Sequence, residues 1–499
     1  MTDSRIASGI SGLDEVLHGG FLPASSYLIV GGPGTGKTVL ALQFLTENAK
    51  RGARCLLVTL AEPEEALRRN AAAFGWDLAG VTIVDLSRSS GEAHFNGEYG
   101  VFPPSDVEAE PIWRRISQAV DASAPECAVI DSATYLRFLS TDMYQYRKQI
   151  QGLVNRLSEK GCLSLLLFEP IELEKDCSLA LAVDGVITLH NDVSGNRLVE
   201  IRTLEINKLR GSSFMSGRHP LRITNHGISV WPHRIERIQR SSYSRSLLHS
   251  GVAGLDELLM GGLPTGTCTL ISGPAGAGKS TLAIQFLTTA AANGHKGVIY
   301  TFEEGTASMV ERCNALSIPL EKALADGSLV IREINPLEYY PEEFLEMLRQ
   351  DRETNGATVF LLDSLRGYTL SMETFGSVVA SMQNIINYIR QCNASLFLVN
   401  EQERVTGDFQ ITDLGVSYVA DNILLLRYAE CGGRVIRVVQ CLKKRTGAHQ
   451  PELRELTFMK EGLVAGERLS QLRGVLTGVP TANGATENAA PDREKHSNE

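Results

Sequence analysis

Short apolar runs alternate with helix-like patterns along the chain, and the same order occurs twice. In the first half, strands are expected over 26–31, 54–62, 127–133 and 162–169, with a helix over 37–51. In the second half, strands are expected over 267–273, 296–304, 358–364 and 395–401, with a helix over 280–294. Continuous apolar strands that alternate with helices are typical of a mostly parallel sheet covered on both faces. Each half is therefore predicted to be an α/β domain.

The two halves are copies of one long repeat. The segment "SGISGLDEVLHGGFLP" (8–23) returns as "SGVAGLDELLMGGLPTG" (250–266), and "TVLALQFL" (38–45) returns as "STLAIQFL" (280–287). A repeat this long is a domain, since solenoid repeats run at about 20–50 residues. We predict an N-terminal domain over 1–235, a C-terminal domain over 236–465 and a disordered tail over 466–499, where large apolar residues are scarce.

The segment that joins the copies is polar and basic. Its arginines are Arg234, Arg237, Arg240 and Arg245. They are open to two interpretations, a stripe that binds nucleic acid or a solvated linker, and we favour the linker.

Composition limits the classes of function. The chain has 499 residues, 43% of them hydrophobic and 21% charged, as in a packed globular protein. A net charge of −10 argues against non-specific attraction to nucleic acid. No apolar run approaches the roughly 18 residues that cross a bilayer, and the first residues do not resemble a leader, so we expect a cytoplasmic protein without a membrane segment. Nine cysteines without a C-x-x-C pair argue against a disulfide framework and a zinc site.

Two glycine-rich phrases stand between a predicted strand and a predicted helix. They read "GGPGTGKT" (31–38) and "GPAGAGKS" (273–280), and both match the P-loop pattern G-x-x-x-x-G-K-[ST]. Such a loop wraps phosphates with its backbone N–H groups, its lysine reaches the β/γ-phosphates, and its final hydroxyl ligates Mg²⁺. The predicted ATP-binding residues are Gly31, Gly34, Gly36, Lys37, Thr38, Gly273, Gly276, Gly278, Lys279 and Ser280. The alternative, a simple glycine-rich turn, would have to occur twice in the same context.

An aspartate ends one apolar strand in each copy. Asp131 closes "AVID" and Asp363 closes "VFLLD". We expect both carboxylates to help hold Mg²⁺ together with Thr38 and Ser280, although an aspartate at a strand end can also cap the next helix.

Glutamates follow another strand, about 24 residues after the P-loop lysine. The second copy has Glu303 and Glu304, whereas the first has Ala61 and Glu62 at the same place. A carboxylate there could orient or deprotonate the nucleophile in hydrolysis or phosphoryl transfer. The alternative is that glutamates at an exposed strand end serve solubility alone.

Taken together, these motifs resemble the KaiC family of clock ATPases and autokinases. The resemblance rests on "SGLDEVLHGG" and "AGLDELLMGG", both P-loops, "LRRNAAAFGWDL", "TFEE" and "KLRGSSFMSGRHP", and it covers the chain to about residue 480. It implies two RecA-like domains, a homo-hexamer of stacked rings and ATP at the subunit interfaces. It also implies ATP hydrolysis in the N-terminal ring and autophosphorylation of a neighbouring subunit in the C-terminal ring.

The resemblance also implies roles for particular residues. Glu62 matches the surviving member of the first carboxylate pair, and Glu303 with Glu304 matches the second pair. The basic residues that reach ATP across the interface match Lys208, Arg210, Lys443 and Arg445. Residues i and i+2 on a strand point the same way, so each basic pair could neutralise charge on a γ-phosphate.

The phosphoacceptor segment of the family is similar to "FQITDLGVSYVADNILLL". Ser417 matches the acceptor serine and Thr412 an accessory hydroxyl, but Tyr418 stands where the family has an acceptor threonine. This difference argues against a two-site phosphorylation cycle.

We therefore predict an ATPase with Ser/Thr autokinase activity that acts as a signalling or regulatory oligomer. Two alternatives stay open. One is a DNA-dependent recombinase or helicase motor, since RecA-like folds also serve DNA, although the acidic balance argues against it. The other is a nucleotide-gated scaffold with little turnover.

Overall fold

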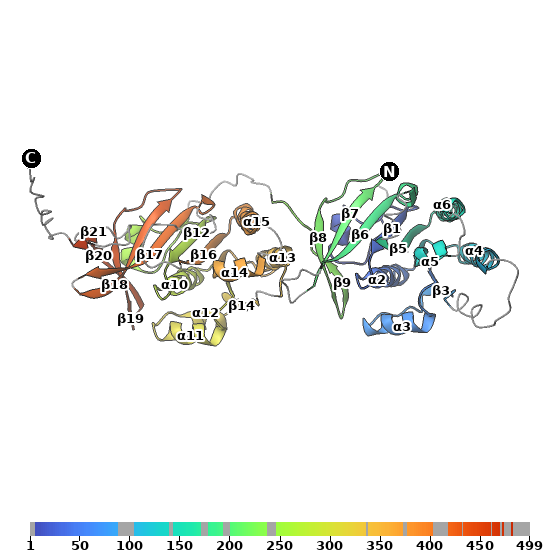
Figure 1. The fold of residues 1–499 in the computed structure, drawn as a ribbon. Helices are drawn as coiled ribbons and strands as arrows, with labels where there is room; N and C mark the ends of the chain where they lie inside the picture. The colour runs from blue at the N-terminus through green and yellow to red at the C-terminus, as the bar shows by residue number, and fades with distance from the viewer. Residues whose placement is uncertain are drawn as a thin grey trace, which may run out of the picture. The chain divides into compact units, whose positions relative to one another are not determined.

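The computed structural model divides the chain into two compact units, Met1–Arg234 and Ile235–Glu499. It describes residues 5–87, 104–138, 143–170, 178–192, 200–236, 246–335, 338–372, 377–402, 418–431, 433–460, 462–469, 472–473 and 481–482. Both units are built on the same plan, so each is described by itself (Figure 1).

The first unit is a nine-stranded sheet with helices on both faces. Its helices are α1 (Leu13–Val16), α2 (Lys37–Lys50), α3 (Glu64–Ala73), α4 (Pro104–Ser123), α5 (Ala133–Phe138), α6 (Met143–Glu159) and α8 (Ser178–Ala182). Its strands are β1 (Ser26–Gly31), β2 (Cys55–Thr59), β3 (Val81–Asp85), β4 (Cys127–Asp131), β5 (Leu163–Phe168), β6 (Gly185–Asp192), β7 (Ile201–Leu209), β8 (Arg218–Thr224) and β9 (Gly227–Val230).

The strand order in this sheet is β3-β2-β4-β5-β1-β6-β7-β8-β9. The strands from β3 to β6 in this order run parallel, and β7, β8 and β9 extend the sheet as an antiparallel meander. The P-loop follows β1, which lies inside the parallel part between β5 and β6. Ligands of open parallel sheets bind beyond the carboxyl ends of the strands, so this position suits a nucleotide.

The second unit repeats the arrangement. Its helices are α9 (Ala253–Leu258), α10 (Lys279–Ala292), α11 (Thr306–Asn314), α12 (Leu320–Ala325), α13 (Pro341–Glu353), α14 (Leu365–Met372) and α15 (Val378–Gln391). Its main strands are β12 (Cys268–Gly273), β13 (Gly297–Thr301), β14 (Leu329–Glu333), β15 (Val359–Asp363), β16 (Ser395–Glu401), β17 (Asn422–Cys431), β18 (Arg434–Lys444), β19 (Arg454–Met459) and β20 (Gly462–Arg468). Their order, β14-β13-β15-β16-β12-β17-β18-β19-β20, matches that of the first sheet strand for strand.

Short strands complete the second unit. Before the main sheet, β10 (Leu247–Leu248) pairs with β11 (Leu263–Pro264). Near the end of the chain, β21 (Leu472–Arg473) pairs with β22 (Thr481–Ala482).

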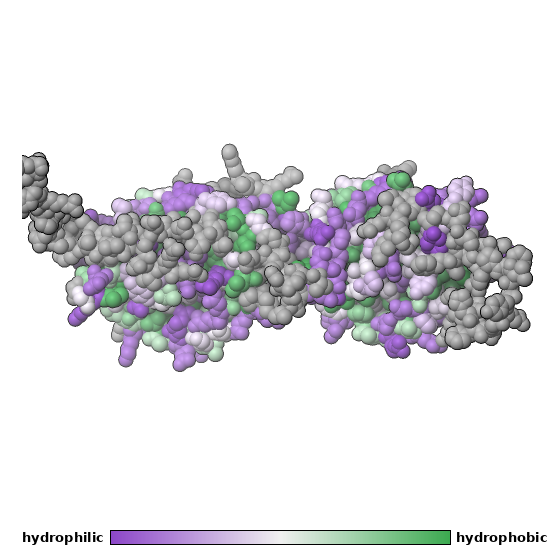
Figure 2. Space-filling view, viewed as in Figure 1, coloured by the Kyte–Doolittle hydropathy of each residue, from purple (hydrophilic) through white to green (hydrophobic). Residues whose placement is uncertain are grey.

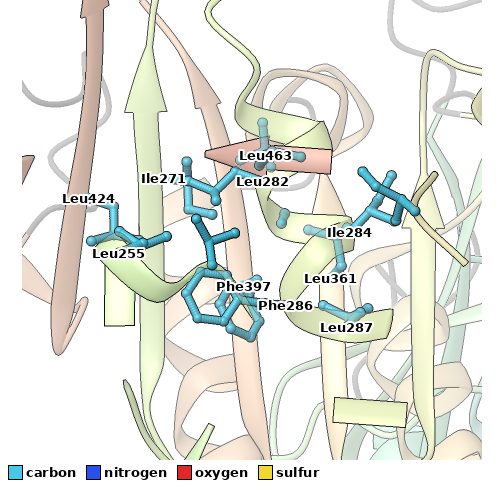
Figure 3. Packing of buried hydrophobic residues seen from close by; sticks show 14 of the residues in the cluster. Leu255, Ile271, Leu282, Ile284, Phe286, Leu287, Leu361, Phe397, Leu424 and Leu463 are labelled. Carbon is cyan, nitrogen blue, oxygen red and sulfur yellow. The ribbon is translucent and has the colours of Figure 1, made fainter. Parts of the chain in front are cut away.

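Each sheet separates two hydrophobic cores. In the second unit, one core packs α10, α11 and α12 against one face, and the other packs α13, α14 and α15 against the opposite face. Adjacent residues of β12 divide between the two cores, Leu270 on one side and Ile271 on the other, as strand geometry requires. The Phe286 and Phe397 rings, 5.1 Å apart, join α10 to β16 (Figure 3). This packing fixes the helix that begins at the P-loop.

Exposed surface is mixed in character. On the face drawn in Figure 2, hydrophilic residues surround scattered hydrophobic ones. In the described ranges, none of the helices combines the length and the apolar composition needed to cross a bilayer. The prediction of two α/β domains with mostly parallel sheets is confirmed.

Candidate nucleotide sites

The first P-loop is a tight backbone turn between β1 and α2. Gly34 and Gly36 have φ values of +75° and +100°, a region that side chains rarely adopt. A Cβ on Gly36 would also lie 2.8 Å from Cδ1 of Ile223. Glycine at these positions lets the loop wind closely in front of the helix, whose N-terminal N–H groups then point at the loop.

The second P-loop has the same conformation. Gly276 and Gly278 have φ values of +72° and +96°. A Cβ on Gly278 would lie 2.0 Å from the ring of Phe458, and one on Gly273 would lie 2.3 Å from the carbonyl oxygen of Leu426. Both loops therefore require glycine for conformation and for space.

Each P-loop lysine turns back into its own loop. Nζ of Lys37 donates to the carbonyl oxygens of Gly31 at 2.7 Å and Gly32 at 3.0 Å. Nζ of Lys279 donates to the carbonyl oxygen of Pro274 at 2.8 Å. Burial lowers the pKa of both lysines, and nearby carboxylates partly offset this effect. The arrangement places an ammonium group at the centre of each loop, where it can meet phosphate.

Behind each loop, a hydroxyl meets a buried carboxylate. The Thr38 hydroxyl donates to Oδ2 of Asp131 at 2.8 Å, and the Ser280 hydroxyl bonds to Asp363. Burial raises the pKa of Asp131 and raises that of Asp363 to about 6, while the hydroxyl opposes the rise in both cases. Hydroxyl and carboxylate oxygens are the donors that a hard divalent cation prefers, so both pairs fit Mg²⁺.

The two adjacent glutamates of the second domain have different surroundings. Glu303 is exposed and accepts a 2.6 Å hydrogen bond from the Ser364 hydroxyl. Glu304 is half-buried and forms an ion pair with Arg312, with 2.6 Å between Nη2 and Oε2. A pocket of about 360 Å³ lies beside them, lined also by Glu333, Asn335 and Glu338 among others. Of the two glutamates, Glu303 is the more exposed, and Glu304 is the one that is paired with an arginine.

The first domain has one glutamate at this place, and backbone contacts identify its counterpart. The Thr59 hydroxyl bonds to the backbone of Glu62, as the Thr301 hydroxyl does to the backbone of Glu304. Glu62 therefore corresponds to Glu304, and Ala61 occupies the position of Glu303.

The predicted basic pair of the first domain lies far from its own P-loop. Leu209, between Lys208 and Arg210, pairs with Gly185, which pairs with Tyr27 near the start of β1. The loop begins only after Gly31, about 13 Å further along the strand at ~3.3 Å per residue. The pair therefore lies away from the P-loop of its own domain.

Within the chain, both members of this pair donate to the backbone near α8. Lys208 reaches the carbonyl oxygens of Ala180, Leu181 and Val183, and Arg210 reaches that of Leu181 at 2.9 Å. Burial, followed by the charge of Arg210, lowers the pKa of Lys208.

The basic pair of the second domain is placed in the same way. Lys443 donates to the carbonyl oxygen of Ala420 at 2.7 Å. Arg445 lies 3.4 Å from the buried Asp421 carboxylate and donates to the carbonyl oxygen of Tyr418. Tyr418 is 61% exposed. Ser417 and Thr412, the predicted acceptor and accessory hydroxyls, lie outside the described residues.

Sequence reasoning missed an aromatic wall beside the second P-loop. Nε of Arg437 donates to the carbonyl oxygen of Gly276 at 3.3 Å, and the Tyr428 hydroxyl donates to that of Ala275 at 3.2 Å. The guanidinium also lies 5.1 Å from the ring centre of Phe458. These residues come from β17, β18 and β19. The sequence signal that could have indicated them is the alternation of buried and exposed positions along antiparallel strands.

The first domain has a different residue set at this wall. Arg202 donates to the carbonyl oxygen of Gly34 at 3.4 Å, as Arg437 does to that of Gly276. Ile223 approaches Gly36 where Phe458 approaches Gly278. The two P-loops are thus alike, but the walls beside them are not.

A further carboxylate that sequence reasoning missed is Glu401, the last residue of β16. The Glu401 carboxylate lies 3.9 Å from Nζ of the buried Lys279, and Glu169 acts on the pKa of Lys37 in the corresponding place. An apolar strand that ends in glutamate was the signal available for both.

Comparison with known proteins accounts for the repeat. A family model described as "ATPase: KaiC" matches residues 6–235 and again residues 248–470. The circadian clock oscillator protein KaiC of Parasynechococcus marenigrum (strain WH8102) is 29% identical over 494 residues, covering 96% of this chain and 94% of that protein. The protein of the same name from Synechococcus elongatus (strain ATCC 33912 / PCC 7942 / FACHB-805) is 28% identical over 495 residues, covering 96% and 92%.

Proposed function

Because the chain belongs to the KaiC family of ATPases, as the sequence motifs predicted, we propose that its two domains use ATP for different ends. In this proposal the second domain transfers the γ-phosphoryl group to a serine, Ser417, of a neighbouring subunit. The first domain binds ATP, hydrolyses it slowly and supports assembly. The protein would act as a signalling or regulatory homo-hexamer.

The observation that carries the proposal is the difference between Glu303 and Ala61. Both domains have a glycine-wound P-loop, a lysine that turns back into the loop and a hydroxyl–carboxylate pair. Among the described residues, the second has an exposed carboxylate next to its strand end, Glu303, bonded to Ser364, and the first has Ala61 at that position. An alcohol is a weak nucleophile whose proton must be accepted during transfer, and Glu303 is placed to accept it.

Mg²⁺ is the cofactor that the site chemistry favours. Thr38 with Asp131, and Ser280 with Asp363, would hold it, and when bound it would neutralise charge on the phosphates. Lys37 and Lys279 would exchange their carbonyl partners for phosphate oxygens. The wall of Tyr428, Arg437 and Phe458 would contact the base or ribose, since it lies directly against the second P-loop.

The proposal also assigns the basic pairs to a neighbouring subunit. Lys208 with Arg210, and Lys443 with Arg445, lie at the end of their sheets opposite the P-loops. In a closed ring each pair could contact the nucleotide of the next subunit, which supports a cyclic oligomer. We further propose residues 1–235 and 236–465 as the functional domains. The predicted tail, 466–499, overlaps β20, which stays in the second sheet as far as Arg468, so we place the start of the tail after that strand.

A single experiment tests the division of roles. The protein is incubated with γ-labelled ATP and Mg²⁺, and released phosphate and protein-bound label are followed together. We expect both products, with label confined to the second domain. Phosphate release without protein-bound label would contradict the kinase assignment, and neither product above background would favour the scaffold alternative.

A further inference from the structure

Arg312 joins three parts of the second nucleotide site. It projects from α11 and pairs with both carboxylate oxygens of Glu304, at 3.3 Å through Nε and 2.6 Å through Nη2. Its Nη1 donates to the hydroxyl of Thr281, which follows the P-loop Ser280 in α10. The Arg312 and Glu304 side chains are 30% and 28% exposed, so this ion pair is partly shielded from water. A bidentate arginine–carboxylate pair fixes orientation as well as charge.

The first domain provides an internal comparison. At the position of Arg312 it has Asn70, whose amide donates to Glu62 at 3.1 Å. At the position of Thr281 it has Val39, which offers no hydroxyl. The contact with the glutamate is kept in both domains, but in the part of the chain that the structure describes, the cation and the link to the P-loop helix occur only in the second.

The cation matters because the second domain has two adjacent carboxylates. In the described part of the chain, no cation forms an ion pair with Glu303. Without Arg312, two unpaired carboxylates would compete for one place near the nucleophile and repel each other.

We propose that Arg312 is a positioning residue of the second site. It holds Glu304 against α10 and so leaves Glu303, the neighbour of Ser364, as the one carboxylate that meets the nucleophile. The inference rests on the proposed function, because it concerns how the base of that reaction is selected. The inference goes beyond the proposed function because it assigns different tasks to Glu303 and Glu304 and names Arg312 as the cause of the difference.

The test compares full-length variants. Second-site turnover is the rate at which protein-bound label forms from γ-labelled ATP and which Lys279→Ala removes, determined in each background, and kcat is that rate at saturating ATP. Arg312→Asn reproduces the first domain's residue, and we expect kcat of the second site to fall about tenfold because Glu303 is displaced. KM for ATP should stay within about twofold, since the P-loop itself is unchanged. Arg312→Lys, which keeps the charge, should recover a large part of the loss.

A double-mutant cycle tests whether Arg312 acts through Glu304. Arg312→Asn should lower kcat of the second site much less in the Glu304→Gln background than in the parent protein, because the residue that Arg312 pairs with is already neutral. Equal costs in the two backgrounds would overturn the inference. An unchanged kcat in Arg312→Asn would also overturn it, as would equal losses in kcat and in bound nucleotide, which would indicate a general structural role.

One further variant separates this inference from the proposed function. If Glu303→Gln abolishes second-site turnover and Arg312→Asn leaves it intact, the positioning role is wrong and the proposed function stands. If Glu303→Gln has no effect, the assignment of the base is wrong, and the positioning role is wrong with it.

Discussion

The Thr38 hydroxyl donates directly to the Asp131 carboxylate, and this bond ties the first turn of α2 to the end of β4. If both groups hold Mg²⁺, Thr38→Val should lower the affinity of the first domain for ATP about tenfold when Mg²⁺ is present. With EDTA the variant and the parent should bind alike. Titration of each with a fluorescent ATP analogue measures this, and an equal loss with and without Mg²⁺ would show that the hydroxyl has another role.

A substitution in one P-loop should remove nucleotide from that loop alone. Lys37→Ala and Lys279→Ala each remove an ammonium from one loop, and the loops belong to separate units. We expect each variant to retain one bound nucleotide per chain after desalting, whereas the parent retains two. From the family resemblance, Lys37→Ala should weaken assembly more. Loss of both nucleotides from either single variant contradicts independent sites.

Phosphate should appear on Ser417 and should depend on Glu303. Glu303→Gln is expected to lower the rate of labelling about 10²–10⁴-fold, the usual contribution of a general base. Glu304→Gln should lower the rate of labelling less, since that carboxylate is paired with Arg312. Mass spectrometry after incubation with ATP locates the label. Label on Tyr418 alone, or on Ser417 in a Glu303→Gln/Glu304→Gln double variant, would show that the acceptor or the base is misassigned.

Assembly should require nucleotide. Light scattering is expected to show a hexamer with ATP and Mg²⁺, because the basic pairs lie at the end of each sheet opposite its own P-loop. Arg445→Ala should retain nucleotide binding and lose second-site turnover. A monomer under saturating ATP and Mg²⁺ would exclude the ring and the trans role of these residues together.

Acid should weaken the second domain through Asp351. This carboxylate is fully buried, and although burial raises its pKa, hydrogen bonds from Arg332, Tyr300 and Asn355 outweigh that effect and lower it. A depressed pKa means that the unfolded chain binds the proton more readily. The stabilisation is therefore present above about pH 3.9, the ordinary value, and is lost as pH falls below it.

Asp351→Ala should lower the free energy of unfolding of the second domain by about 2–3 kcal/mol at pH 7 and by less in acid. Urea unfolding between pH 3.5 and 7 measures both. Glu353→Gln, on the same helix and 65% exposed, is the control and should change little. A difference between Asp351→Ala and the parent that does not shrink in acid would contradict this assignment.

Strands and helices of the parallel core could be predicted closely from the sequence. The run over 26–31 is β1 without adjustment, and the helix expected over 37–51 ends one residue earlier as α2. The strand is buried throughout and the helix begins directly after a glycine, so the sequence marks where each element begins and ends. The antiparallel strands after β6 and β17 were foreseen only at the two basic pairs, and their bounds were not predicted, because strands such as β7 are only half-buried and carry charged residues such as Arg202.

Side-chain partnerships were harder to foresee. The loss of a glutamate at Ala61 was visible from the repeat, but the separate surroundings of Glu303 and Glu304 were not. Arg437 meets Gly276 across 161 positions of sequence. No spacing rule connects residues so far apart, since strand order decides which of them become neighbours.

Because of the aromatic wall, nucleotide bound in the two domains should be distinguishable by fluorescence. Tyr428 and Phe458 flank the second P-loop, while the first has Ile223 in the place of Phe458. A nucleotide with a fluorescent base would stack on rings in one domain and meet aliphatic and polar groups in the other. Its emission would then differ between the two domains, so one spectrum could report how much nucleotide each domain of an intact, unlabelled chain has bound.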